Sequence, residues 1–149
     1  MDKFEKLARW FSYQIKLEDR FNRKIPKVKV CRGDIYSCYL GENIGHEKSK
    51  LEGRPCVVIS TDKINTRSSN IIVIPLTKNI KYKDGSTKLL RYEWNYILYK
   101  SKYPLKYDSM AQCEDMRCIS KIRLGAYIGH VNTKDMENLK KRLKITLQI

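Results

Sequence analysis

The chain has 149 residues, a length that suits one domain with its own hydrophobic core. It carries 31 Lys and Arg against 16 Asp and Glu, and this net charge of +15 indicates a polyanionic partner such as a nucleic acid. No apolar run approaches the roughly 20 residues that span a bilayer, and residues 1–24 are too charged for a signal peptide, so we expect a cytoplasmic protein without membrane contact.

The first 24 residues predict one amphipathic helix that ends before Pro26. Its apolar stripe has near-helical spacing, with two further apolar residues close to it: Phe4, Ala8, Phe11 and Ile15, then Leu7 and Phe21. We expect this stripe to pack against the body of the protein or against a partner. Residues 1–26 are therefore interpreted as a helical extension of a domain that spans 27–149.

Short runs rich in β-branched and aromatic residues predict three strands, at 34–40, 55–60 and 70–76. The polar stretch 61–69 between the last two is predicted to be a connecting loop. A further strand is expected across 109–119, although neither of its faces is consistently apolar.

The C-terminal part predicts a last strand at 125–131 and a helix at 132–147. The inward face of that helix is expected to carry Met136, Leu139, Leu143 and Leu147.

Five cysteines are odd in number and include no C-x-x-C pair, and the two histidines lie far apart. We therefore expect free thiols in place of disulfides or a zinc site, and we predict no metal and no cofactor. The cysteines are Cys31, Cys38, Cys56, Cys113 and Cys118.

Residues 78–107 combine eight Lys and Arg with six tyrosines and Trp94, against two acids. Basic side chains bind phosphates and exposed rings stack on unpaired bases, so this composition favours single-stranded nucleic acid over duplex. Tyrosines at alternate positions are also ordinary in strand packing, and that interpretation stays open.

Several short motifs occur in a fixed order: "RGDIY" (32–36), "GHE" (45–47), "GRPCVVIS" (53–60), Asn65, "VIPLT" (73–77) and "CEDMRCISKIRL" (113–124). Together they resemble the MazF/PemK family of toxin endoribonucleases, over residues 31–147. The resemblance implies a mainly β, SH3-like small barrel with helices and a homodimer. It also implies metal-independent cleavage of single-stranded RNA at short sequences and a MazE-like antitoxin partner.

By this resemblance Arg54 and Thr77 match the pair most regularly assigned to catalysis. His46 matches a histidine that some members use as an acid, and Glu114 matches a proposed base. Asn65 matches an RNA-contacting position. The predicted RNA-binding residues are Asn65, Arg67, Lys78, Lys81, Lys83, Gln112 and Arg117.

Two features depart from the family pattern. Gln112 stands where PemK-type members have an active-site arginine, and the segment 47–54 is longer and less glycine-rich than the usual loop. The first departure bears on the division of catalytic labour, and the second on the RNA sequence that is cut.

The predicted residue types suit RNA chemistry, because RNA supplies its own nucleophile in the 2′-OH. The reaction then needs proton transfer to and from oxygen and fixed positive charge beside the phosphorane. Arg54 can supply that charge with a planar fork, His46 and Glu114 can transfer protons, and Thr77 can donate a hydrogen bond.

Three other functions remain open at this point. A CcdB-like toxin that inhibits gyrase shares the fold but needs no proton transfer by His46. A catalytically inactive RNA-binding module is compatible with Gln112. A structural interaction protein would leave the charge of +15 unexplained.

Overall fold

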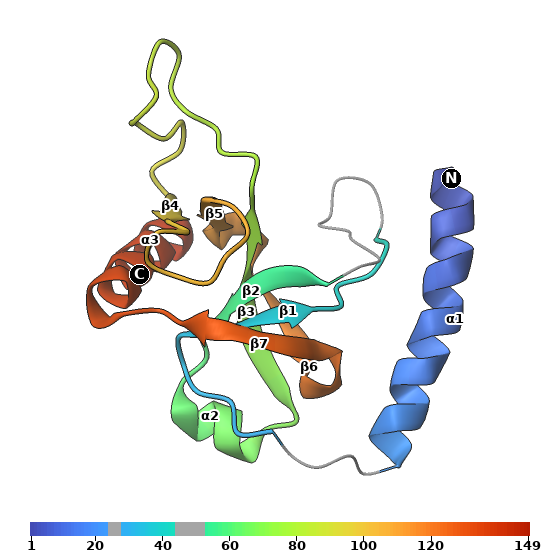
Figure 1. The fold of residues 1–149 in the computed structure, drawn as a ribbon. Helices are drawn as coiled ribbons and strands as arrows, with labels where there is room; N and C mark the ends of the chain where they lie inside the picture. Colours follow the sequence, from blue (N-terminus) through green and yellow to red (C-terminus); the bar gives the residue numbers. More distant parts are fainter. Residues whose placement is uncertain (24–27, 44–52) are drawn as a thin grey trace.

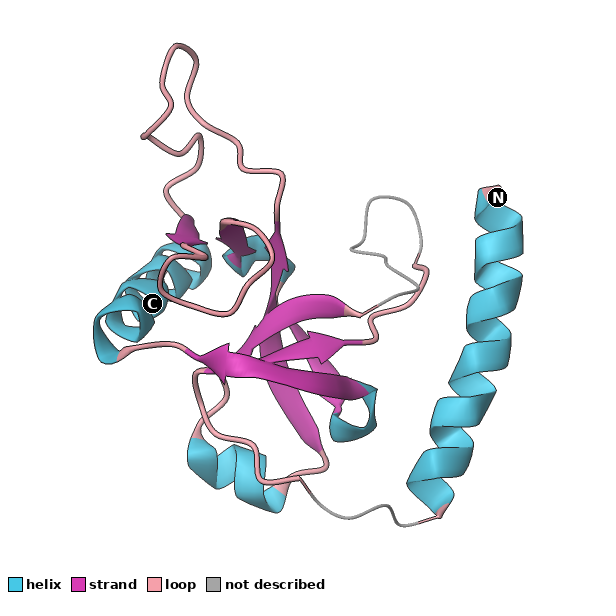
Figure 2. Cartoon of the chain, viewed as in Figure 1, coloured by secondary structure: helices cyan, strands magenta, loops and turns pink. Residues whose placement is uncertain are grey.

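The computed structural model describes residues 1–23, 28–43 and 53–149. In these residues seven strands form one antiparallel sheet, flanked by three α-helices and two short 3₁₀ helices (Figures 1 and 2). The strands are β1 (Asp34–Cys38), β2 (Arg54–Val58), β3 (Asn70–Thr77), β4 (Asn95–Leu98), β5 (Ser109–Gln112), β6 (Arg117–Ser120) and β7 (Leu124–His130). The helices are α1 (Lys3–Asn22), α2 (Asp62–Arg67), η1 (Cys113–Asp115), η2 (Lys121–Arg123) and α3 (Thr133–Leu147). The expected mainly β fold with helices is therefore confirmed.

The strand order is β4-β5-β3-β2-β1-β7, and β6 also pairs with β3. Two strands pair with the same edge of β3, one after the other along its length. Strand β5 pairs with Leu76 and Thr77, and β6 pairs with residues 70–73. The predicted single strand at 109–119 is wrong, because η1 interrupts it. The interruption falls opposite Ile74 and Pro75, and a proline has no N–H with which to continue a ladder.

Two apolar clusters lie on the two faces of this sheet. One lies inside the curl of β1, β2, β3, β6 and β7 and includes Cys38, Cys56 and Ile119. The other lies on the outer face, where Met136 and Leu139 of α3 pack on Ile74 and its neighbours. The strands therefore curl around the first cluster as a small barrel, and α3 covers the second (Figure 1).

The N-terminus of α3 is fixed by a buried carboxylate. Asp135 is 4% exposed and accepts hydrogen bonds from the hydroxyls of Tyr103 and Tyr96, the latter at 2.6 Å. Burial alone would raise the pKa of Asp135, but the two hydroxyls outweigh it and hold that pKa below its usual value. Burial, reinforced by Asp135, raises the pKa of each tyrosine to about 12. The helix is thereby tied to β4 and to the loop that contains Tyr103.

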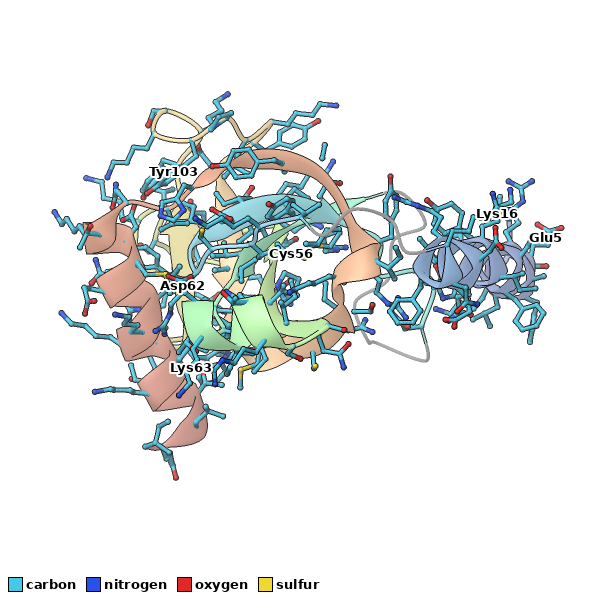
Figure 3. All side chains as sticks on the ribbon, turned by 90° about the horizontal axis from the view of Figure 1, so that it is seen from below. Glu5, Lys16, Cys56, Asp62, Lys63 and Tyr103 are labelled. Atoms are coloured by element: carbon cyan, nitrogen blue, oxygen red, sulfur yellow. The ribbon has the colours of Figure 1, made fainter. Side chains whose placement is uncertain are left out.

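Helix α1 begins at a capping box formed by Asp2 and Glu5 and runs alongside the barrel (Figure 1). It packs through Trp10 and Leu17, which are buried, and not through the predicted stripe. Phe4, Phe11 and Ile15 are 82%, 66% and 57% exposed, so packing of this stripe against the body of the same chain is wrong. Figure 3 looks at the helix end-on, with Glu5 and Lys16 on its exposed sides.

The ring of Trp10 explains which face of α1 docks. Gly41 lies directly under it, and a Cβ at this glycine would be 1.9 Å from a Trp10 ring atom. The guanidinium of Arg123 lies 5.4 Å from the ring centroid, and Tyr13 packs on Tyr39 at 5.4 Å. Lys3 adds an ion pair with Glu42.

The stretch 61–69 is not a plain loop, because it contains α2. Thr61 caps this helix by accepting a hydrogen bond from the Ile64 N–H. Among the described residues no helix is long and apolar enough to cross a membrane.

Candidate active site

Arg54 and Thr77 lie at the same end of the sheet. Arg54 begins β2 and Thr77 ends β3, and continuing the register Cys56↔Pro75 places the two on one row. Their side chains thus share the inner face of the curl. The Nη1 of Arg54 donates to the Leu76 carbonyl at 3.1 Å, which fixes the guanidinium beside Thr77. The Thr77 Oγ1 accepts from the Asn79 N–H at 3.2 Å, and its hydroxyl proton can still be donated elsewhere.

Gln112 is the last residue of β5, the strand that pairs with β3 beside Thr77. Met110 pairs with Thr77, so Gln112 lies two residues farther on the same face of the sheet. It is 6% exposed, and its Oε1 has no hydrogen-bond partner in the described residues. A buried acceptor without a partner is costly, so this position is suited to a donor from a ligand.

Glu114 lies in η1, directly after β5, and is exposed. Its Oε2 accepts a hydrogen bond of 2.8 Å from the Nδ2 of Asn95, and the same amide donates to the Ala111 carbonyl at 3.3 Å. Asn95 is 1% exposed and pairs with Gln112 in the sheet. It therefore orients the candidate base. No sequence pattern pointed to Asn95, since its partner lies 19 positions away.

Arg54 and Arg117 lie near the buried Cys56 thiol, and Arg123 lies near Arg117. Burial raises the pKa of the Cys56 thiol well above its ordinary value, and the charges of Arg54 and Arg117 oppose that rise. Burial, and next the charge of Arg117, lowers the pKa of Arg123. Figure 3 shows Cys56 in the middle of the body. The charges that surround this end of the curl can stabilise a phosphate.

Lys78, Lys81 and Lys83 are exposed and follow Thr77 on the loop that projects from the end of β3 (Figure 1). The Nζ of Lys78 lies 5.1 Å from the centroid of the Tyr107 ring. These lysines extend the positive charge outward from Arg54 and Thr77.

Asn65 and Arg67 lie at the other end of β2 and β3, in α2. Asn65 is 1% exposed, and both ends of its amide bond to Ser60. The backbone carbonyl of Asn65 accepts a hydrogen bond from the Lys121 Nζ. Arg67 is exposed. The structure thus separates these two residues from Arg54, and the sequence pattern could not show that this asparagine closes a turn internally.

His46 lies outside the described residues. The histidine that the structure describes, His130, binds Asp34 through Nδ1 at 2.9 Å and is half-exposed. Asp34 is four positions along β1 from Cys38, which pairs with Arg54, so His130 lies away from the candidate site. All five cysteines are free thiols. The described residues contain no group of three His, Cys, Asp or Glu side chains that could hold a metal ion.

The structure thus shows a small curled sheet of a basic protein, with an arginine and a threonine side by side at one end and a carboxylate on the neighbouring strand pair. Residues 31–147 match the family model described as PemK-like, MazF-like toxin of type II toxin-antitoxin systems, so the chain belongs to this family.

A curated relative, Endoribonuclease MazF of Staphylococcus saprophyticus, is 30% identical over 116 residues, which cover 78% of this chain and 89% of the relative. The crystal structure of MazF from Deinococcus radiodurans has a TM-score of 0.64 at 15% identity and covers 82% of this chain and 99% of its own. A MazE–MazF crystal structure from the same organism has a TM-score of 0.57 at 14% identity, with 82% and 98% covered.

Proposed function

We propose that this chain, an endoribonuclease toxin by family, cuts single-stranded RNA without a metal ion, by attack of the RNA 2′-OH on the adjacent phosphorus. The observation that carries the proposal is the placement of Arg54 beside Thr77, with its guanidinium held by the Leu76 carbonyl. The name of the staphylococcal relative, an endoribonuclease, supports the reaction class.

The proposed reaction balances as one transesterification. The 2′ oxygen bonds to phosphorus and releases its proton to a base, while the bond from phosphorus to the 5′ oxygen breaks and that oxygen receives a proton. The products are a 2′,3′-cyclic phosphate and a 5′-OH. Glu114, oriented by Asn95, and His46 are proposed to transfer these protons. Arg54 stabilises the charge on the phosphorane, and Thr77 donates to one of its oxygens.

Three further assignments belong to this proposal. The toxin acts as a homodimer in the cytoplasm, where it inhibits translation by cutting mRNA. A MazE-like antitoxin neutralises it, which the solved MazE–MazF relative supports. Residues 27–149 form the toxin domain, and residues 1–26 form an extension outside the family match.

The test compares Arg54→Ala and Arg54→Lys with the wild type on a single-stranded RNA in EDTA. We expect Arg54→Ala to lower the cleavage rate by on the order of a hundredfold or more while RNA affinity falls only modestly. Arg54→Lys should restore only part of the rate, because an ammonium lacks the planar fork. Thr77→Ala should cost less than Arg54→Ala, since it removes a neutral donor.

A single 2′-deoxy substitution on the 5′ side of the cut serves as the matched chemical control. It should abolish cleavage and leave binding nearly intact. Cleavage that survives this substitution would refute the 2′-OH as nucleophile. If Arg54→Ala lowered RNA affinity and the rate at limiting RNA by the same factor, while the rate at saturating RNA stayed unchanged, Arg54 would be a binding contact. A wild type that binds RNA without cutting it would support an inactive RNA-binding module.

A further inference from the structure

A cavity of about 420 Å³ opens at the outer edge of β4. Its walls come from residues 83–93, from β4 itself and from Arg142 of α3. Because β4 is the last strand of the sheet, this space lies outside the curl that holds Arg54 and Thr77. Its volume falls within the roughly 300–1,000 Å³ range of small-ligand sites.

The cavity is lined by aromatic rings in a fixed arrangement. Tyr92 and Tyr99 are 38% and 46% exposed and both line it. The Tyr92 ring stacks on Trp94, with centroids 4.7 Å apart and planes 11° from parallel. One face of Tyr92 is therefore covered and held in place by Trp94. The opposite face is available for a flat ligand to continue the stack.

Positive charge surrounds these rings. Lys83, Lys88 and Arg142 line the cavity together with one acid, Glu93. Arg142 is fixed in the wall, because its Nη1 donates to the Glu93 carbonyl at 2.8 Å and its guanidinium lies 6.0 Å from the Tyr96 ring centroid. Lys83 and Lys88 are exposed and can reach a phosphate. An acidic peptide would satisfy the lysines but would leave the stacked rings without a flat partner.

Asn95 connects this cavity to the candidate active site. It lines the cavity, and its amide holds the Glu114 carboxylate at 2.8 Å. The cavity and the Glu114 carboxylate thus share Asn95 as a common neighbour.

We propose that this cavity binds one unpaired nucleotide of the RNA substrate, close to the cut. Its base stacks on Tyr92, and its phosphate lies near Lys83 and Lys88. The inference rests on the proposed function in taking RNA as the ligand. It makes Tyr92 a residue that selects which RNA is cut, while the chemistry stays with Arg54.

The test is a double-mutant cycle between the protein and the RNA, with binding measured by fluorescence anisotropy. The probe is a short single-stranded RNA with fluorine at every 2′ position, so that no nucleophile is present. It carries the mapped cut site, or a mixed sequence if the protein cuts no RNA. Each base in turn is replaced by an abasic sugar. We expect loss of one base to weaken binding to the wild type by about tenfold. The same loss should have no effect in Tyr92→Leu, which lacks a ring.

Two control variants make the result specific. Tyr92→Phe keeps the ring and should behave as the wild type, which separates stacking from a folding defect. Tyr127→Ala removes a ring that is 57% exposed on β7 and should leave the effect of the missing base unchanged.

Additive losses at every base position, or a Tyr92→Phe variant that behaves as Tyr92→Leu, would overturn the inference. Tyr92→Leu that binds every RNA as the wild type does would also overturn it. RNA cleavage that depends on Arg54, without coupling at Tyr92, would remove the inference alone. Coupling in a protein that cuts no RNA would instead remove the proposed function and leave the cavity assigned.

Discussion

Asn95 illustrates how one buried side chain can control an exposed one. Glu114 is exposed and lies in a single turn of 3₁₀ helix, so its own backbone restrains it little. The Asn95 amide supplies the restraint from a neighbouring strand. This hydrogen bond favours one position of the carboxylate over the others.

We predict that Asn95→Ala lowers the cleavage rate by about tenfold or more, because the carboxylate loses its donor. The measurement is the single-turnover rate at saturating enzyme, with the fold checked by circular dichroism.

A cycle with Glu114→Gln separates positioning from stability. If Asn95 acts through Glu114, then Asn95→Ala should change the rate little in the Glu114→Gln background. Equal losses in both backgrounds would mean that Asn95 only supports β4. If Glu114→Gln alone left the rate unchanged, the role proposed for Glu114 would be refuted.

The sequence motifs drew attention to Arg54 and Thr77 but not to the residues around them. Arg54 and Thr77 stand in motifs with a fixed spacing, and the structure brings them to one row of neighbouring strands. The partnership of Asn95 with Glu114 depends on strand pairing across the sheet, which no local pattern encodes. Asn65 carries no local mark of burial either, because polar side chains in a turn can bond inward or face solvent.

At the scale of elements, α1 shows why apolar spacing alone did not choose the docking face. Trp10 and Leu17 are seven residues apart and so lie on one side of the helix, just as the residues of the predicted stripe do. Only tertiary structure decides between them, since Gly41 leaves the space that the Trp10 ring fills. The Trp10 indole, packed into the space beside Gly41, buries more apolar surface than an exposed phenyl ring such as Phe11 does.

We therefore predict opposite outcomes for two aromatic substitutions in α1. Trp10→Ala should release the helix from the barrel and raise the hydrogen exchange of the α1 amides to the level of a free helix, because it empties the buried contact. Phe11→Ala, on the exposed face, should leave exchange nearly unchanged. Similar exchange in the two variants would contradict the docking face.

Removal of residues 1–23 tests the role of α1 in catalysis. The helix contacts the barrel through Gly41, Tyr39 and Arg123, and it lies outside residues 31–147, which match the family. We expect the shortened chain to cleave a short RNA within a few-fold of the full chain. A loss equal to that of Arg54→Ala, with the fold intact, would assign a catalytic role to α1.

The N-terminus of α3 makes the stability of the protein depend on pH. The folded state holds the pKa of Asp135 below its usual value, so this contribution is present near neutrality and is lost as the pH falls through that pKa. The pKa of Tyr103 is raised from 10.0 to about 12, so its contribution is present below pH 10 and is lost as the pH rises to about 12.

We predict that Tyr103→Phe lowers the free energy of unfolding at neutral pH by about 1–3 kcal/mol, because a buried carboxylate loses a donor. The same variant should lose less stability than the wild type between pH 10 and pH 12. Urea unfolding measures both effects. Tyr127→Phe, at an exposed position, should change stability by less than about 0.5 kcal/mol.

For the molecule as a whole, the charge of +15 should dominate encounter with RNA. We predict that affinity for an uncleavable RNA falls steeply with salt, and that Lys81→Glu with Lys83→Glu flattens this slope, since fewer counterions are released. Anisotropy titrations at several salt concentrations measure it.

Reversal of Lys6 and Lys16 on α1 changes the net charge by the same amount and serves as the control. It should leave the slope close to that of the wild type. If instead the α1 pair flattens the slope and the loop pair does not, the RNA-binding surface lies on the side of α1.

The pairing of β3 with β5 and β6 also sets the order in which the protein can be assembled during synthesis. Arg54 and Thr77 are made early, but β3 stays unpaired along one edge until residues 109–120 have left the ribosome. Strand β1 waits in the same way for β7, whose His130 pairs with Asp34 across 96 positions. Such distant pairings are slow to close, because the intervening chain must first lose its conformational freedom. A nascent chain that ends before residue 109 thus carries Arg54 and Thr77 without the strand that pairs with β3 beside Thr77.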